Sequence, residues 1–159
     1  ASLVCASAGA AVTHVDASKK AIAWARENAE LSGLADRPIR WICEDARRYV
    51  QREVGRGSRY EGIILDPPKF GRGPKNETWR FEENLPELLD VVKQLLSDRP
   101  LFVILTAYAV RLSYLALSQA LADRPSPLGG VMETGEIVME GSAADLLDPE
   151  RVKEAYLGG

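Results

Sequence analysis

Apolar residues occur along this chain in two alternating patterns, one typical of β-strands and one typical of α-helices. Short apolar runs that predict strands cover residues 11–16, 39–42, 60–66 and 101–106. Between these runs, apolar side chains recur every three or four residues, most clearly from Leu85 to Leu96, which predicts amphipathic helices. Strands that alternate with helices of this length favour right-handed βαβ units, so we expect an α/β fold with a mostly parallel sheet.

Capping residues and glycines indicate where the helices begin and end. Ser18 can cap a helix that Gly33 ends, and Asp45 can open a short helix. A further helix is expected over residues 113–122. Residues 1–8 look like the last turns of a helix that a glycine closes.

A turn rich in proline and glycine, residues 124–130, divides the chain. We expect residues 1–129 to form the main body and residues 130–159 to form a strand pair followed by an acidic helix. Residues 133–159 contain two basic and seven acidic residues, whereas the whole chain has a net charge of −3. The remainder is only weakly basic, so it lacks the strong basic surface of a self-sufficient nucleic-acid-binding domain.

Composition limits the compartment and the chemistry. The chain is 46% hydrophobic and 27% charged, which is typical of a globular domain. No apolar run approaches the roughly 20 residues of a membrane span, so no membrane partner is expected. Cys5 and Cys43 lack metal or redox spacing, and His14 has no acid or cysteine at a recognisable spacing. We therefore expect no metal site and a cytoplasmic location.

The most informative stretch is Ile63-Ile64-Leu65-Asp66-Pro67-Pro68-Lys69-Phe70. An apolar run that ends in a carboxylate and two prolines predicts a buried parallel strand that stops at the carboxyl edge of the sheet, because proline cannot donate to a ladder. Ligands bind at this edge in open α/β sheets, so Asp66 is a candidate for the reaction itself. The stretch from Lys69 to Asn76 is glycine-rich and basic, which predicts a loop.

The segment from Asp66 to Phe70 resembles the fourth motif of the class I S-adenosylmethionine-dependent methyltransferases. Residues downstream narrow the resemblance to the group of ribosomal RNA large-subunit methyltransferase I, namely Gly71, Arg72, Gly73, Pro74, Glu77 and Trp79. The resemblance covers residues 1–137. It implies a Rossmann-like fold, S-adenosylmethionine as the cofactor, and methyl transfer to an RNA substrate, with ribosomal RNA favoured.

The resemblance assigns cofactor binding to acids that follow strands. Asp16 with its neighbour Ala17 would bind the ribose hydroxyls, and Asp45 with Ala46 would bind the adenine. Asp66 would also contact the cofactor. From the residues alone, Asp16 can also be an acid favoured at a helix entry and Asp45 an N-cap, and these alternatives stay open.

The same resemblance implies a catalytic segment that faces the substrate base, formed by Asp66, Pro67, Pro68 and Lys69. Phe70 and Trp79 offer ring faces on which a base can stack, and Arg72 can contact the RNA backbone. The alternative is that both aromatic side chains belong to the core and that the arginine is a solvated loop charge.

Two departures from the family pattern change these expectations. The first strand of the family, which is the central one of its sheet, and its glycine-rich loop have no counterpart before Ala1. We therefore expect a fold that lacks this strand and loop, with two strands left without their shared partner. Two alternatives follow, an RNA methyltransferase that is active or inactive in this form, or a non-catalytic α/β domain that self-associates or binds a partner through the open sheet edge.

The second departure concerns the methylated atom. Methylation at cytosine carbon 5 needs a thiolate that adds to the ring. Residues 105–108, where related enzymes carry this cysteine, are Leu-Thr-Ala-Tyr. We expect Cys5 and Cys43 on the far side of the sheet, so transfer to a nitrogen or an oxygen is favoured.

Residues 140–159 resemble a different family, the carboxyl terminus of the ATP-binding subunits of branched-chain amino-acid transporters. In that family a short acidic helix ends in Tyr-Leu-Gly, as residues 156–158 do here. No phosphate loop of the Gly-x-x-x-x-Gly-Lys-Ser/Thr kind occurs in the chain, so an ATPase has no catalytic basis.

Overall fold

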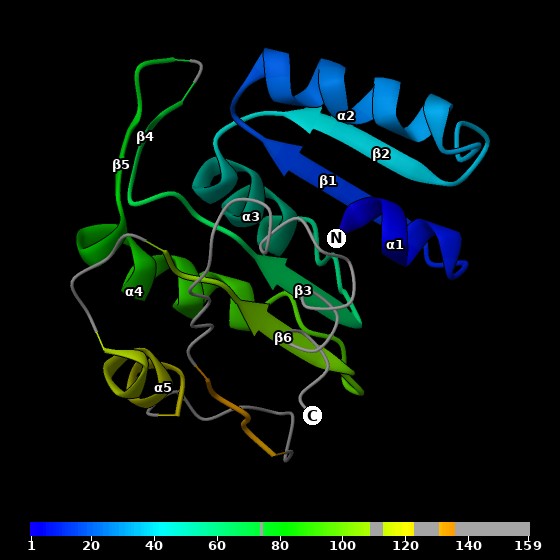
Figure 1. Cartoon of the computed structure of the whole chain (residues 1–159). Coiled ribbons are helices and arrows are strands. Elements are labelled where there is room, and N and C mark those ends of the chain that lie inside the picture. Colours follow the sequence, from blue (N-terminus) through cyan, green and yellow to red (C-terminus); the bar gives the residue numbers. More distant parts are fainter. Residues whose placement is uncertain (74, 109–112, 123–130, 136–159) are drawn as a thin grey trace, which may run out of the picture.

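The computed structural model describes residues 1–73, 75–108, 113–122 and 131–135. Strands alternate with helices, as the sequence predicts (Figure 1). The elements are α1 (Ser2–Ser7), β1 (Val12–Asp16), α2 (Lys19–Leu31), β2 (Ile39–Cys43), α3 (Ala46–Gly55), β3 (Gly62–Leu65), β4 (Phe70–Arg72), β5 (Thr78–Arg80), α4 (Phe81–Lys93), β6 (Phe102–Leu105) and α5 (Tyr114–Ala122).

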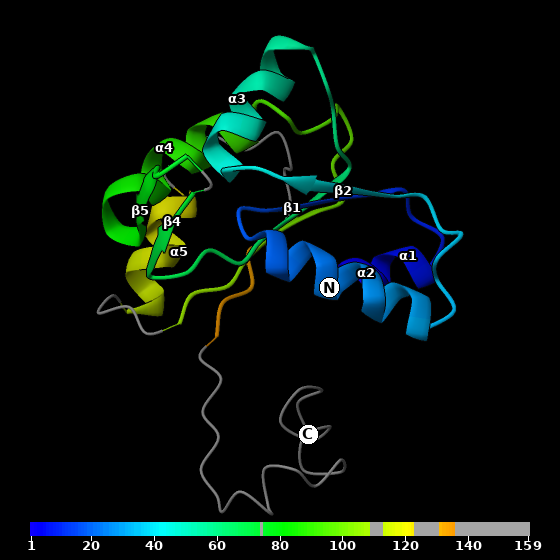
Figure 2. The same cartoon turned by 90° about the horizontal axis from the view of Figure 1, so that it is seen from above.

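Two pairs of parallel strands form the centre of the fold. β1 pairs with β2 along their whole lengths, and β3 pairs with β6 in the same way. Figure 2 shows α1 and α2 on one face of the β1–β2 pair and α3 on the opposite face. Parallel strands with helices on both faces are the arrangement of Rossmann-like folds, so the predicted α/β class is confirmed.

β1 and β3 share no hydrogen-bonded ladder, and no described strand is hydrogen-bonded between them. The sequence predicts this arrangement of two strands without a shared partner. Every residue of β1 and β3 is only half-buried, so the expectation of a buried strand at residues 63–65 is wrong. A parallel strand becomes fully buried when neighbours cover both of its edges and faces, whereas side chains of β1 and β3 line a common cavity.

The main hydrophobic core lies where α4 packs against β3, β6 and α3. Its buried side chains come from β5 and α4, and are Trp79, Phe81, Leu85, Leu88, Leu89 and Val92. Half-buried side chains of Val50, Ile63, Leu65 and Leu105 pack against them. Spacings of three and four residues place the α4 side chains on one face of the helix, as the sequence predicts.

The loop expected from Lys69 to Asn76 instead contains strand β4, which pairs antiparallel with β5. The N–H of Gly73 donates to the carbonyl of Glu77 at 2.8 Å and closes the turn between the two strands. Asn76 has a φ of 64°, a left-handed conformation that asparagine tolerates better than most residues. The glycine and proline content hid this hairpin, because its short strands acquire their pairing only from each other.

Two predicted helix caps are present. The hydroxyl of Ser18 accepts a hydrogen bond from the N–H of Ala21 at 3.2 Å, at the start of α2. The carboxylate of Asp45 accepts one from the N–H of Arg48 at 3.1 Å, at the start of α3. Each side chain satisfies an N–H group that the first helical turn leaves without a backbone partner. Gly9 follows α1 with a φ of 95°, as the predicted helix end requires.

The boundary predicted between residues 129 and 130 lies outside the described residues. The acidic helix and residues 140–159, which resemble transporter subunits, also lie outside them. Residues 131–135 are described and contain no helix or strand, and the division into two parts stays a prediction. In the described part of the chain, no helix is both long enough and apolar enough to cross a membrane.

Candidate functional site

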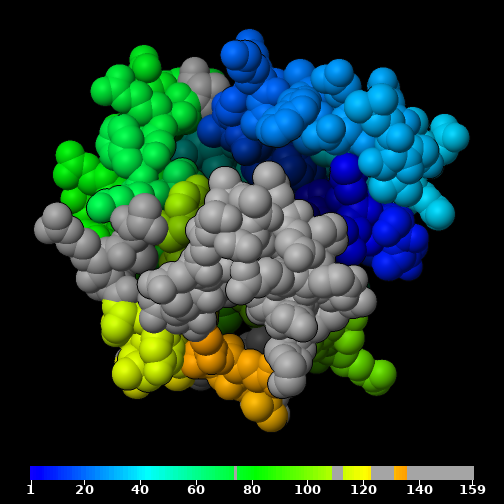
Figure 3. All heavy atoms as spheres, viewed as in Figure 1, coloured from blue at the N-terminus to red at the C-terminus, as the bar shows by residue number. Residues whose placement is uncertain are grey.

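A cavity of about 470 Å³ extends along β1 and β3 and includes the residues that follow these strands. In the space-filling view, the surface is recessed between the green hairpin and the blue N-terminal elements (Figure 3). Most of the predicted site residues line the cavity, namely Asp16, Ala17, Asp45, Ala46, Asp66, Pro67, Pro68, Arg72 and Trp79. Lys69 and Phe70 do not line it, and both are exposed.

Three carboxylates reach the cavity from three successive βα connections. Asp16 ends β1, Asp45 follows β2, and Asp66 follows β3. These strands run parallel, so their carboxyl ends lie on one edge of the fold and bring distant residues together. The three acids differ in burial, since Asp45 is 6% exposed, Asp16 is half-buried and Asp66 is exposed.

Asp16 is oriented by its own loop. Its Oδ1 atom accepts a hydrogen bond from the N–H of Ser18 at 2.6 Å. The thiol of Cys43 lies 3.7 Å from the carbonyl of Ala17. Cys43 pairs with Asp16 in the β1–β2 register, so it lies in the strand pair that does not contain β3 and Asp66. It does not line the cavity.

Asp66 is held by a residue that the sequence analysis passed over. Thr106 directly follows β6, and its hydroxyl donates a hydrogen bond to the Oδ1 atom of Asp66. The N–H of Thr106 also donates to the carbonyl of Leu65 at 2.9 Å. A polar residue directly after an apolar strand was the available signal. Thr106 thus lies in the segment 105–108, which contains no cysteine, and its hydroxyl fixes the acid.

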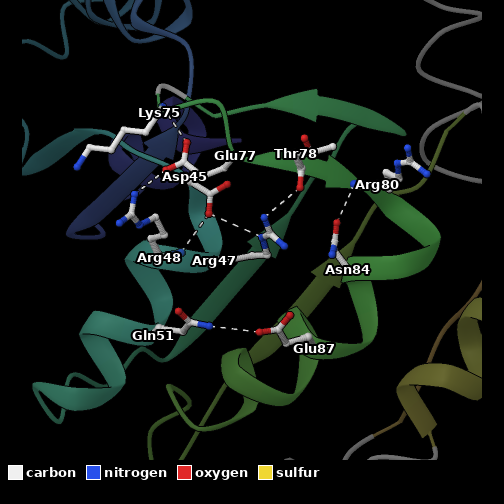
Figure 4. Close-up of polar contacts among 10 residues, drawn as sticks. All are labelled: Asp45, Arg47, Arg48, Gln51, Lys75, Glu77, Thr78, Arg80, Asn84 and Glu87. Atoms are coloured by element: carbon white, nitrogen blue, oxygen red, sulfur yellow. Dashed lines mark hydrogen bonds and ion pairs between the residues drawn. The ribbon is translucent and has the colours of Figure 1, made fainter.

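Asp45 is both a helix cap and part of the cavity wall. Besides the cap, its Oδ1 atom lies 3.8 Å from Nε of Arg47. The Nη2 atom of Arg47 donates to the carbonyl of Thr78 at 3.1 Å, so α3 contacts the hairpin (Figure 4). Arg47 was not singled out from the sequence, where it is one of two adjacent arginines in a charged segment.

The two candidate stacking aromatics lie in different environments. Trp79 is 8% exposed and belongs to the core, and its Nε1 atom donates to the carbonyl of Pro68 at 2.6 Å. Phe70 is 55% exposed and is free of the core. The carbonyl of Lys69 accepts a hydrogen bond from the N–H of Phe81 at 2.9 Å, and the side chain of Lys69 is exposed. Two successive carbonyls at the carboxyl end of the Pro-Pro segment are therefore anchored, and Phe70 is the aromatic that faces solvent.

A buried polar group lies beneath the cavity. Glu53 is 2% exposed and accepts hydrogen bonds from Arg56 and Ser58, each at 2.8 Å. The hydroxyl of Tyr60, which lines the cavity, contacts Glu53 at 3.4 Å and the hydroxyl of Tyr49 at 3.1 Å. Burial and then the hydrogen bond with Tyr49 raise the pKa of Tyr60, so this hydroxyl stays protonated at neutral pH.

Replacing Glu53 with glutamine should make the free energy of unfolding depend less on pH in the acid range. Burial raises the pKa of Glu53, but the hydrogen bonds from Ser58 and Arg56 outweigh it and place the pKa below its ordinary value of 4.5. Such a group contributes stability above the unfolded pKa and loses it as the pH falls through the folded pKa. We expect the difference in unfolding free energy between the wild type and Glu53→Gln, measured by urea denaturation, to shrink below pH 4.5.

The variant Glu61→Gln removes an exposed carboxylate and controls for the change in net charge. A difference between wild type and Glu53→Gln that stays constant from neutral pH to acid would show that the hydrogen bonds of Glu53 do not depend on its charge.

Parts of this chain are similar in sequence to known proteins. No family model matches the chain. The chain is 33% identical over 100 residues to ribosomal RNA large subunit methyltransferase K of Neisseria meningitidis, covering 61% of this chain and 28% of that protein. It is 39% identical over 59 residues to ribosomal RNA large subunit methyltransferase I of Aeromonas salmonicida, covering 37% of this chain and 15% of that protein.

A solved structure is similar in fold as well as in sequence. The crystal structure of an S-adenosylmethionine-dependent methyltransferase from Agrobacterium tumefaciens matches with a TM-score of 0.75 and 54% identity, over 76% of this chain and 38% of that chain. The chain therefore spans well under half the length of these relatives. In sequence and in fold it is similar to the class I S-adenosylmethionine-dependent methyltransferases, as the segment from Asp66 to Phe70 predicts.

Proposed function

We propose that this chain carries the cofactor-facing and substrate-facing part of an S-adenosylmethionine-dependent methyltransferase that acts on RNA of the large ribosomal subunit. One observation supports this most, the placement of Asp16, Asp45 and Asp66 around a single cavity at the ends of three parallel strands. The names of the relatives support the choice of cofactor and of RNA.

The donor and acceptor groups of the cavity fit an adenosyl group. Within the described residues, the contacts of Asp16 and Asp45 fall on Oδ1, so Oδ2 of each can accept from a ribose hydroxyl or an exocyclic amine. Ala17 and Ala46 add only a methyl group to the wall, which lets a ligand approach the backbone. Ala46 is also the first residue of α3, and N–H groups at a helix start lack backbone partners.

S-adenosylmethionine supplies a methyl group on a sulfonium centre, so the protein mainly has to align a nucleophile in a site that excludes water. Pro67 and Pro68 restrict the backbone after β3 and hold it against Trp79. Asp66, fixed by Thr106, can accept a hydrogen bond from the N–H or O–H of the substrate group and keep its lone pair directed at the methyl. No cysteine lines the cavity, which supports transfer to nitrogen or oxygen.

The exposed residues after Pro68 extend the proposed site toward RNA. Phe70 would stack on an RNA base, while Arg72 and the side chain of Lys69 would contact phosphates. Among the described residues, no group of histidines, cysteines and acids could hold a metal ion. Self-association through the strand edges is not favoured by the comparisons. The cytoplasmic location stays a prediction from sequence.

Calorimetric titration of the chain with S-adenosylhomocysteine tests the cofactor site. We expect micromolar binding, about −8 kcal/mol. Replacing Asp16 with alanine should weaken it about tenfold or more, because a hydrogen bond to a charged group contributes roughly 1.5–3 kcal/mol.

The variant Asp36→Ala removes an exposed carboxylate outside the cavity and should bind like the wild type. A folded wild type that releases no heat would overturn the proposal, as would equal affinities of the wild type and Asp16→Ala.

A further inference from the structure

The first turn of α3 contacts both halves of the candidate site. Asp45, on the cofactor side, caps the helix through its Oδ1 atom. Arg47 places its Nε atom 3.8 Å from that same oxygen, and this buried Nε has no hydrogen-bond partner in the described structure. Its guanidinium is thus attracted to Asp45 without being tightly bound to it.

The other end of the Arg47 guanidinium contacts the hairpin. Nη2 donates to the carbonyl of Thr78 at 3.1 Å, and the guanidinium carbon lies 5.9 Å from the centre of the Trp79 ring, within reach of a cation–π interaction. Trp79 in turn donates to the carbonyl of Pro68. A continuous series of contacts therefore runs from Asp45 through Arg47 and Trp79 to the Pro-Pro segment.

Arg48 makes a second contact between α3 and the hairpin, and this contact serves as a comparison for that of Arg47. Its guanidinium lies 2.7 Å from Oε1 of Glu77, and the Oε2 atom of Glu77 accepts the N–H of Lys75 at 2.8 Å (Figure 4). The Arg48 side chain is 51% exposed, whereas that of Arg47 is 21% exposed. Solvent screens the Arg48 pair more strongly, and Arg47 is the arginine that also contacts Trp79.

We propose that Arg47 is a positioning residue that couples a ligand at Asp45 to the placement of Trp79 and the hairpin. This rests on the proposed function. A ligand amine that donates to Asp45 satisfies part of its charge and weakens the pull of Asp45 on Arg47. The guanidinium then favours Thr78 and Trp79, which holds the hairpin and the Pro-Pro segment in place for RNA. Coupling of this kind is reciprocal, so an ordered hairpin also strengthens cofactor binding, by about fivefold.

Hydrogen exchange tests the contact between Arg47 and the hairpin without any ligand. In Arg47→Gln we expect the amides of residues 70–80 to exchange about fivefold faster, the effect of losing one hydrogen bond of ordinary strength. Amides of α2, which is remote from the hairpin, should keep their rates. Arg48→Gln is the matched control and should change the hairpin rates less. Unchanged hairpin rates in Arg47→Gln would overturn the inference whether or not the cofactor site exists.

Trp79 fluorescence tests the coupling itself. The chain has three tryptophans, so Trp24→Phe and Trp41→Phe leave Trp79 as the sole tryptophan. S-adenosylhomocysteine should shift its emission in this background and leave it unchanged after Arg47→Gln, with binding confirmed by calorimetry. Arg47→Lys keeps the charge but lacks the guanidinium whose separate nitrogens contact Asp45 and Thr78. It should therefore restore less than half of the shift in Trp79 emission.

The outcomes separate the two proposals. Binding of S-adenosylhomocysteine with an equal emission shift in the background protein and in Arg47→Gln overturns the coupling and leaves the proposed function intact. Absence of binding to the folded wild type overturns both. If Arg47→Gln fails to fold by circular dichroism, Arg47→Lys carries the test, and an undiminished shift in that variant contradicts the inference.

Discussion

On the proposed function, replacing Asp66 with alanine should lower methyl transfer to large-subunit ribosomal RNA by at least about 100-fold, the cost expected when a reacting group is misplaced by about 1 Å. Asp66 follows β3 at the cavity wall, where Thr106 holds its carboxylate and Pro67 restricts the backbone. The side chain is exposed, so its loss removes no core contact. The measurement is transfer of a labelled methyl group from S-adenosylmethionine to the RNA, with a thermal melt to show that the fold is unchanged.

Thr106→Val separates the presence of the acid from its orientation. This variant keeps the carboxylate and the volume of the neighbouring side chain but removes the hydroxyl that donates to Asp66. We expect a smaller loss of rate than in Asp66→Ala, with unchanged affinity for S-adenosylhomocysteine. An Asp66→Ala variant that transfers methyl groups at the wild-type rate would remove this acid from the mechanism.

The fold and the placement of the three acids around one cavity could be predicted because their signals are local. Ser18 and Asp45 act as helix caps through N–H groups three residues away, so the sequence nearby decides their role. Apolar runs that end in an acid predict strands whose carboxyl ends meet on one edge, and this brings Asp16 and Asp66 to one cavity.

Other features could not be predicted because they depend on residues far away in the chain. The hairpin exists because β4 pairs with β5, and α3 holds it through side chains about 30 residues distant in sequence. Thr106 is forty residues from Asp66 and becomes its partner only because β6 lies beside β3. The burial of Trp79 and the exposure of Phe70 follow from the pairing of β4 with β5 and not from their similar hydrophobicity.

The degree of burial of β3 shows the same limit. Ile63, Ile64 and Leu65 form an apolar run that predicts a buried strand, yet each is half-buried. Hydrophobicity predicts a preference for the interior, whereas the burial reached depends on the neighbours present on both edges of the strand.

Replacing Trp79 with alanine should destabilise the protein by about 3–5 kcal/mol, the usual cost of removing a large buried aromatic side chain. Trp79 belongs to the core with Phe81 and Leu85, and its loss leaves a cavity beneath the hairpin. The Pro68 carbonyl also loses its hydrogen-bond donor, so the segment after Asp66 loses one of its two anchors. Urea denaturation followed by circular dichroism measures the change.

Trp79→Phe divides this effect into its two parts. Phenylalanine keeps most of the ring packing but cannot donate to Pro68, so we expect a loss of about 1–2 kcal/mol from the hydrogen bond and the smaller ring. If packing dominates, Trp79→Phe keeps most of the unfolding free energy that Trp79→Ala loses. Its rate of methyl transfer should still fall, because the hydrogen bond that anchors the Pro-Pro segment is missing. Equal losses of stability in the two variants would instead assign the role of Trp79 to its hydrogen bond with Pro68.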